Sequence, residues 1–102
     1  RIFTKNEIIE SSLIKKKNNF FSKRFAAKES LAKAIGSGFR NNLNFKDIEI
    51  INDNLGKPYF VLNKRIKNII SKKFKVNNFN LFLSISDEKE YSIAFTIIQK
   101  IR

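Results

Sequence analysis

The segment from Phe20 to Gly38 constrains the fold most, because it predicts one long helix that ends at a pair of glycines. Advancing by 100° per residue places four apolar side chains on one stripe of this helix: Phe21, Phe25, Ala32 and Ile35. Gly36 supplies the positive φ that ends such a helix, and Gly38 permits a sharp turn after it. The remaining elements are therefore expected to pack against this helix.

Glu29 and Lys33 are predicted on the flank of this apolar stripe, at the boundary between core and solvent. One interpretation is ordinary, since a glutamate four residues before a lysine is a common surface pair worth about 0.2–0.5 kcal/mol. The other is a carboxylate and an amine that act together on a partly buried edge. The spacing alone favours the surface pair.

Length and composition narrow the possible chemistry. The 102 residues fit a single domain over 1–102, with a modest core. The chain has no cysteine and no histidine, which excludes thiol nucleophiles, disulfides, Cys/His zinc sites and histidine bases. Any metal must then be held by carboxylate or other oxygens, which favours magnesium.

The formal net charge of +12 predicts an acidic partner: nucleic acid, anionic lipid or an acidic protein. A compositional origin is the alternative, because heavy use of Lys, Asn, Ile and Phe is what A·T-rich coding sequence produces without selection for binding. No apolar run has the length of a membrane span and no signal sequence is visible, so we expect a cytoplasmic protein without a membrane partner.

A short helix is predicted over Thr4 to Leu13, with Thr4 as its cap and Glu7 completing a capping box. The stretch Lys15–Asn19 breaks the apolar pattern. It is interpreted as a solvated link, with a basic patch for docking an acidic partner as the alternative.

The second half of the chain predicts two strand pairs around a helix. A turn at Asn52–Pro58 joins a strand near Ile48–Ile51, with Phe45 beside it, to a strand at Tyr59–Leu62. The other expected elements are a helix over Lys64–Phe74 and strands over Phe79–Ser86 and Tyr91–Ile101. The last strand is apolar on both faces, which predicts burial by a helix on one side and by another subunit on the other. The fold class is α+β, an antiparallel sheet packed against a long helix.

The string from Arg24 to Gly38 reads Arg-Phe-Ala-Ala-Lys-Glu-Ser-x-x-Lys-Ala-x-Gly-Ser-Gly. It resembles the signature of the holo-acyl-carrier-protein synthases, the trimeric branch of the phosphopantetheinyl transferases. The resemblance continues more loosely through Asn52–Pro58 and Ser84–Tyr91, so it extends from about Phe20 to the end of the chain.

This resemblance implies a phosphopantetheinyl-transferase-like fold and an enzyme. The activity would move 4′-phosphopantetheine from coenzyme A to a serine of apo acyl carrier protein, with magnesium, for fatty acid synthesis. It also implies a homotrimer with active sites between subunits. The carrier proteins of such enzymes are acidic, which suits the basic composition of this chain.

The resemblance implies roles for particular residues. Glu29 is the implied magnesium ligand, and Lys33 the implied catalytic contact near the reacting pyrophosphate. The residues implied to bind coenzyme A are Arg24, Lys28, Lys33, Gly36, Ser37, Gly38, Lys57 and Pro58. Because the Gly-Ser-Gly run follows the C-terminal end of a helix, whose dipole repels anions, nearby cations must supply the attraction, with Arg40 as a further candidate. A simple cap and turn is the alternative for these glycines.

Two departures from the family pattern stand out. The Gly-x-Asp strand that carries the second magnesium ligand is not found, so we expect an N-terminally incomplete chain that is inactive by itself. The family often has histidines where this chain has Phe82 and Asp87. Two alternatives stay open, a small basic RNA-binding module and an inactive oligomerising fragment. The RNA alternative is disfavoured because Phe21, Phe25 and Phe74 are assigned to core faces.

Overall fold

The computed structural model describes residues 2–14, 17–36, 44–88 and 91–101. Its elements, in chain order, are α1 (Lys5–Ser11), α2 (Lys17–Ile35), a 3₁₀ turn η2 (Phe45–Asp47), β1 (Glu49–Asn52), β2 (Pro58–Val61), α3 (Lys64–Phe74), β3 (Phe79–Asp87) and β4 (Ser92–Lys100). The strands form two antiparallel pairs, β1 with β2 and β3 with β4. The α+β prediction is confirmed, with two hairpins in place of one continuous sheet.

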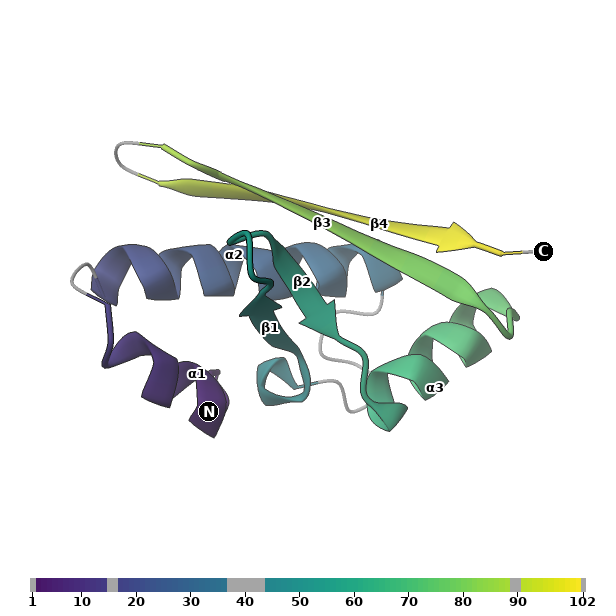
Figure 1. Ribbon diagram of the computed structural model, residues 1–102. Helices are drawn as coiled ribbons and strands as arrows, with labels where there is room; N and C mark the ends of the chain where they lie inside the picture. Colours follow the sequence, from purple (N-terminus) through teal and green to yellow (C-terminus); the bar gives the residue numbers. More distant parts are fainter. Residues whose placement is uncertain (1, 15–16, 37–43, 89–90, 102) are drawn as a thin grey trace.

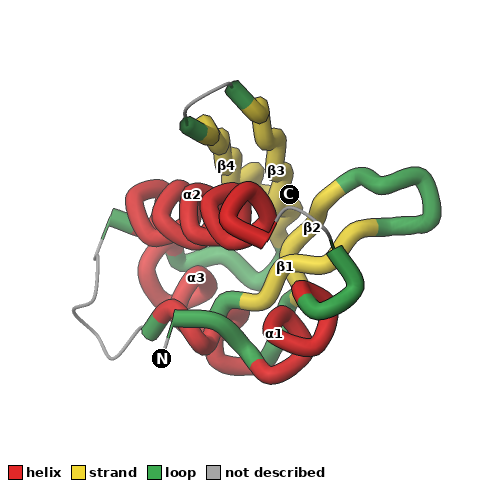
Figure 2. Tube along the Cα trace, turned by 90° about the vertical axis from the view of Figure 1, so that its left-hand side faces the viewer, coloured by secondary structure: helices red, strands yellow, loops and turns green. Residues whose placement is uncertain are grey.

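Helix α2 runs through the middle of the molecule and is covered from two sides (Figure 1). The long β3–β4 hairpin lies along one side, where the Ser22 hydroxyl lies 3.3 Å from that of Ser92. The view in Figure 2 shows α1, β1 and α3 on the other side of α2. The core between these layers consists of Ala27, Leu31, Ala32, Ile35, Phe45, Ile48, Ile50, Phe60, Ile66, Ile70, Phe79 and Leu83.

The buried face of α2 agrees with the predicted apolar stripe only in part, at Ala32 and Ile35. Phe25 is 37% exposed and Phe21 only partly buried, whereas the charged residues Arg24 and Lys28 are buried. The spacing of apolar residues does not identify a buried face that includes two cations. Since α2 is also covered from two sides, a single stripe describes it poorly.

The N-terminal helix is capped as predicted. Thr4 Oγ1 accepts from the Glu7 backbone N–H at 3.1 Å, and a Glu7 carboxylate oxygen accepts from the Thr4 N–H at 2.9 Å. The helix ends at Ser11, two residues before the predicted end. Helix α2 begins at Lys17, inside the predicted link, while positions 15–16 of that link lie outside the described residues.

The β1–β2 hairpin and α3 follow the sequence prediction closely. One Asp53 carboxylate oxygen accepts from the backbone N–H groups of Leu55 and Lys57, both at 2.9 Å, and Gly56 takes a φ of +84°. This side-chain bonding fixes the turn from within. Helix α3 has the predicted bounds, Lys64–Phe74, while Phe45 belongs to the 3₁₀ turn and not to a strand.

The β3–β4 hairpin has one covered and one open face. Residues of β3 alternate as predicted, with Leu83 buried and Phe82 exposed. On β4, Ala94 and Ile98 pack on the core, but Phe95 is 70% exposed and Ile93 and Ile97 are exposed as well. The predicted cover by a helix is confirmed, and cover of the other face by another subunit stays a prediction. None of the described helices combines the length and apolar character that a membrane crossing requires.

Candidate functional site

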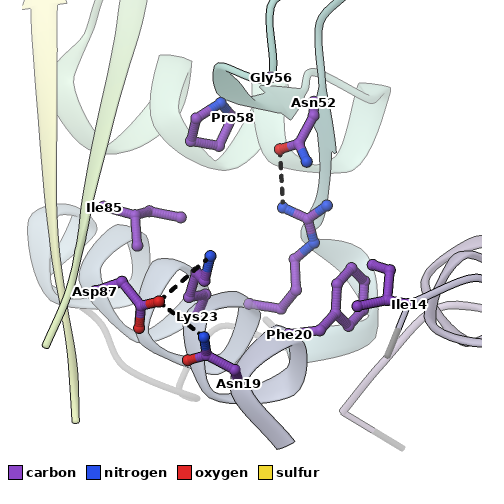
Figure 3. A pocket seen from close by; sticks show the side chains of 10 residues that line it. Ile14, Asn19, Phe20, Lys23, Asn52, Gly56, Pro58, Ile85 and Asp87 are labelled. Carbon is purple, nitrogen blue, oxygen red and sulfur yellow. Dashed lines mark hydrogen bonds and ion pairs between the residues drawn. The ribbon is translucent and has the colours of Figure 1, made fainter. Parts of the chain in front are cut away.

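A pocket of about 280 Å³ lies between the first turns of α2, the β1–β2 turn and the end of β3 (Figure 3). Its lining residues are Ile14, Asn19, Phe20, Lys23, Arg24, Asn52, Gly56, Pro58, Ile85 and Asp87. Three segments far apart in the sequence meet here, because α2 is placed between both hairpins. The lining combines apolar surface with two cations, one carboxylate and two amides.

Arg24 is the most buried charge of this pocket, at 3% exposure. Its Nη2 donates to the Glu10 carboxylate at 3.3 Å, its Nη1 donates to Asn52 Oδ1 at 3.4 Å, and its guanidinium carbon lies 4.7 Å from the centre of the Phe20 ring. The buried Nε has no hydrogen-bond partner among the described residues. The Arg24 guanidinium is therefore incompletely hydrogen-bonded, and the bonds that it does form, at 3.3 to 3.4 Å, are long.

Asp87 connects the end of β3 to α2 across the pocket. Its Oδ2 accepts from the Asn19 amide at 2.7 Å and lies 3.7 Å from the Lys23 ammonium. Asn19 and Lys23 are one turn apart on α2, so both face the same carboxylate, as Figure 3 shows. Among the described residues, each pocket cation thus has one carboxylate neighbour: Glu10 for Arg24 and Asp87 for Lys23.

Lys28 occupies a different place from the one the resemblance implied. It is fully buried, and its ammonium contacts Glu7 Oε1 at 2.7 Å, the Ile2 carbonyl at 2.7 Å and the Phe45 carbonyl at 2.9 Å. These three acceptors use all three of its N–H donors. No donor is left for a ligand in this arrangement, so the structure does not favour the predicted contact of Lys28 with coenzyme A.

The Lys28–Glu7 pair joins several segments inside the protein. Glu7 is also buried, and its second oxygen accepts from the Ile50 backbone N–H at 3.2 Å. Burial lowers the pKa of Lys28 below its ordinary value of 10.5, while the hydrogen bond and charge of Glu7 oppose this shift. The capping box identified Glu7 in the sequence, but nothing local indicated that its carboxylate would meet Lys28.

Glu29 and Lys33 lie outside the pocket, on the exposed surface of the C-terminal half of α2. The predicted partly buried edge is wrong, because both side chains are exposed. Neither forms a hydrogen bond or ion pair with another described residue. The described residues contain no group of three His, Cys, Asp or Glu side chains that could hold a metal ion. A free carboxylate such as Glu29 nevertheless fits Mg²⁺, which is commonly held by one or two carboxylates together with substrate phosphates.

The remaining predicted contacts divide between the pocket and the solvent. Pro58 lines the pocket, and Lys57 next to it is exposed. Gly36 ends α2 with a φ of +84°, as predicted. Ser37, Gly38 and Arg40 lie outside the described residues. The sequence reasoning did not select Asn19, Phe20, Lys23 or Asn52, because their role depends on the meeting of distant segments.

Comparison with known proteins gives one consistent result. The model of the 4′-phosphopantetheinyl transferase superfamily matches residues 1–96. The holo-[acyl-carrier-protein] synthase of Pelagibacter ubique is 60% identical over 100 residues, which cover 98% of this chain and 78% of the relative. The synthase of Orientia tsutsugamushi (strain Boryong) is 46% identical, with 96% of this chain and 76% of the relative covered.

Solved structures support the same relationship. The crystal structure of holo-[acyl-carrier-protein] synthase from Neisseria meningitidis matches with a TM-score of 0.84 and 37% identity, covering 98% of this chain and 78% of that one. The synthase of Bacillus anthracis, in complex with coenzyme A (3′,5′-ADP), matches with a TM-score of 0.79 and 32% identity, covering 99% and 78%. The resemblance noted in the sequence is thereby confirmed.

Proposed function

Since the chain belongs to the holo-[acyl-carrier-protein] synthase family of the 4′-phosphopantetheinyl transferase superfamily, we propose that it transfers phosphopantetheine from coenzyme A to acyl carrier protein. A serine hydroxyl of the carrier forms a bond to the phosphorus that carries the pantetheine. The bond from this phosphorus to the bridging oxygen breaks, the serine proton is released, and adenosine 3′,5′-bisphosphate leaves. Modification of the carrier proteins of fatty acid synthesis, in the cytoplasm, is the proposed role.

The pocket is the observation that carries this proposal, as the place for the nucleotide end of coenzyme A. Phe20, Pro58 and Ile85 supply apolar surface for a base, and Arg24 supplies the positive charge of a buried guanidinium for a phosphate. The solved relative from Bacillus anthracis is a complex with coenzyme A (3′,5′-ADP), which supports this class of ligand.

Glu29 and Lys33 are the proposed reactive-end residues. Glu29 would hold Mg²⁺, and this ion when bound neutralises charge on the pyrophosphate. Lys33, one turn further along α2, would donate to the phosphate oxygens near the reacting phosphorus. The exposure of both side chains and their lack of partners among the described residues suit groups that bind a substrate.

We further propose that the open face of the β3–β4 hairpin forms the contact between subunits of a homotrimer. In the strand register Phe82 pairs with Ile97 and Ser84 with Phe95, so exposed apolar side chains stand next to one another. On this face, the β3 residues from Asn80 to Ser86 and the β4 residues that pair with them include no lysine or arginine. A stacking platform for RNA needs cations beside its aromatic residues, so this face favours a protein partner.

The activity is tested on the chain extended at its N-terminus by the family's Gly-x-Asp strand, which is the starting chain here. It is incubated with coenzyme A, Mg²⁺ and apo acyl carrier protein, and the mass increase of the carrier is measured. Relative to the starting chain, Glu29→Gln is expected to lower the transfer rate at limiting Mg²⁺ at least 100-fold, because it removes the charge that holds the ion. Glu49→Gln, which removes a carboxylate from β1, is the matched control. Equal rates for the starting chain and Glu29→Gln would refute the role of Glu29, and no mass increase at any chain concentration would refute the proposed activity.

A further inference from the structure

We infer that Lys23 binds a phosphate group of the ligand in this pocket and that Asp87 competes with the ligand for Lys23. This inference rests on the proposed function, since it names a further residue for the same nucleotide subsite. Lys23 and Asp87 face each other across the junction of α2 and β3 (Figure 3). Neither the signature of the family nor the sequence prediction assigned a role to Lys23.

The bond between the two side chains is weak by its geometry. The ammonium lies 3.7 Å from Asp87 Oδ2, beyond hydrogen-bond distance, and this same oxygen already accepts from Asn19 at 2.7 Å. The two side chains are 39% and 38% exposed, so water screens their attraction. The Lys23 ammonium forms no hydrogen bond with a described residue and keeps its donors for a ligand.

Lys23 lies next to Arg24, so α2 presents two cations to one pocket. The positive charges of the Arg24 guanidinium and the Lys23 ammonium together suit a doubly charged phosphate group, which offers several acceptor oxygens. A nucleoside phosphate also uses the apolar lining from Phe20, Pro58 and Ile85.

The carboxylates near these cations determine how tightly an anion is held. In the free chain Asp87 offsets the charge of Lys23, and a phosphate that takes the lysine must displace this interaction. Asp87 is thus expected to weaken the binding of coenzyme A and of the bisphosphate product alike. Because both ligands carry the same nucleotide end, the weaker binding speeds release of the product.

Calorimetric titration of the chain with adenosine 3′,5′-bisphosphate tests the inference directly. Lys23→Met is expected to raise the dissociation constant at least fivefold, and Asp87→Asn to lower it about fivefold. In the double variant, Asp87→Asn should change the constant less than twofold relative to Lys23→Met, because Asp87 acts through Lys23. Lys67→Met removes the same charge from the exposed side of α3 and serves as the control, with a change below twofold.

Three results would overturn the inference. The first is a dissociation constant for Lys23→Met within twofold of that of the starting chain, and the second is a higher dissociation constant for Asp87→Asn. The third is that Asp87→Asn lowers the dissociation constant by the same factor in the starting chain and in Lys23→Met. Lys23→Gln replaces Lys23→Met if the melting temperature shows that the latter is unfolded. If the starting chain binds the bisphosphate and transfers phosphopantetheine while Lys23 variants bind equally well, this inference alone fails. If the starting chain neither binds nor transfers, the proposed function fails with it.

Discussion

Replacement of Lys28 by methionine is expected to destabilise the chain far more than a typical lysine substitution. Methionine has a similar length, so the change leaves the volume nearly filled but removes the ammonium. Glu7 then remains buried without its cation, and the carbonyls of Ile2 and Phe45 lose their donor. Breaking one side of a buried ion pair costs about 3–5 kcal/mol. The free energy of unfolding of a small domain is about 5–15 kcal/mol in total, so the change removes a large part of it.

A double-mutant cycle with Glu7→Gln separates the ion pair from the packing. Glutamine removes the charge and keeps one oxygen, which can accept from the Thr4 N–H or from the Ile50 N–H but not from both, since these groups bond to different Glu7 oxygens. We expect Lys28→Met combined with Glu7→Gln to cost less than the two single losses together, by about 1–3 kcal/mol, because the double variant leaves no lone buried charge.

Urea unfolding followed by circular dichroism gives the free energies for this cycle. Lys67→Met on the exposed side of α3 is the control and is expected to stay within about 0.5 kcal/mol of the starting chain. A loss below about 1 kcal/mol for Lys28→Met, or strictly additive losses in the cycle, would refute the reasoning that this buried pair stabilises the fold.

Three further outcomes are expected. Thr4→Ala should lower the free energy of unfolding by about 1 kcal/mol, since it removes the cap of α1, and urea unfolding measures this. Phe95→Ser should shift the proposed trimer toward monomers in light scattering at micromolar concentration, and an unchanged assembly would exclude this face as the contact. The pKa of Lys28 is lowered in the folded chain. Between this lowered pKa and 10.5, the unfolded chain therefore carries more of the Lys28 proton than the folded chain does. The contribution of Lys28 to the free energy of unfolding should therefore rise with pH toward 10.5, and Lys28→Met should remove this rise in urea titrations at a series of pH values.

Local signals predicted the elements that depend on near neighbours in sequence. Thr4 and Glu7 form the capping box, Asn52–Pro58 forms the turn, and Lys64–Phe74 forms a helix with an inward and an outward face. In each case the deciding contacts lie within a few residues of one another. The alternation along β3 was predictable for the same reason, since a strand has a period of two residues.

Other parts could not be predicted because their partners are distant in sequence. Arg24 and Lys28 are buried only because Glu10, Asn52 and Glu7 reach them from other elements. A lysine on a helix is normally taken as solvent-exposed, so periodicity missed Arg24 and Lys28 and assigned the exposed Phe25 to the core, although Ala32 and Ile35 are buried as predicted. The pocket has the same origin, because it forms only where α2, the β1–β2 turn and β3 meet.

The adjacent residues Lys28 and Glu29 show how one helix serves two purposes. A buried ammonium needs acceptors on every side, and here they come from α1, the segment before it and the 3₁₀ turn. Meeting all three acceptors leaves α2 little freedom to rotate about its axis. Because successive helical residues are 100° apart, fixing the direction of Lys28 also fixes the direction of Glu29, whose side chain is exposed. The lysine of this Lys-Glu pair thus determines the direction in which the proposed metal ligand points.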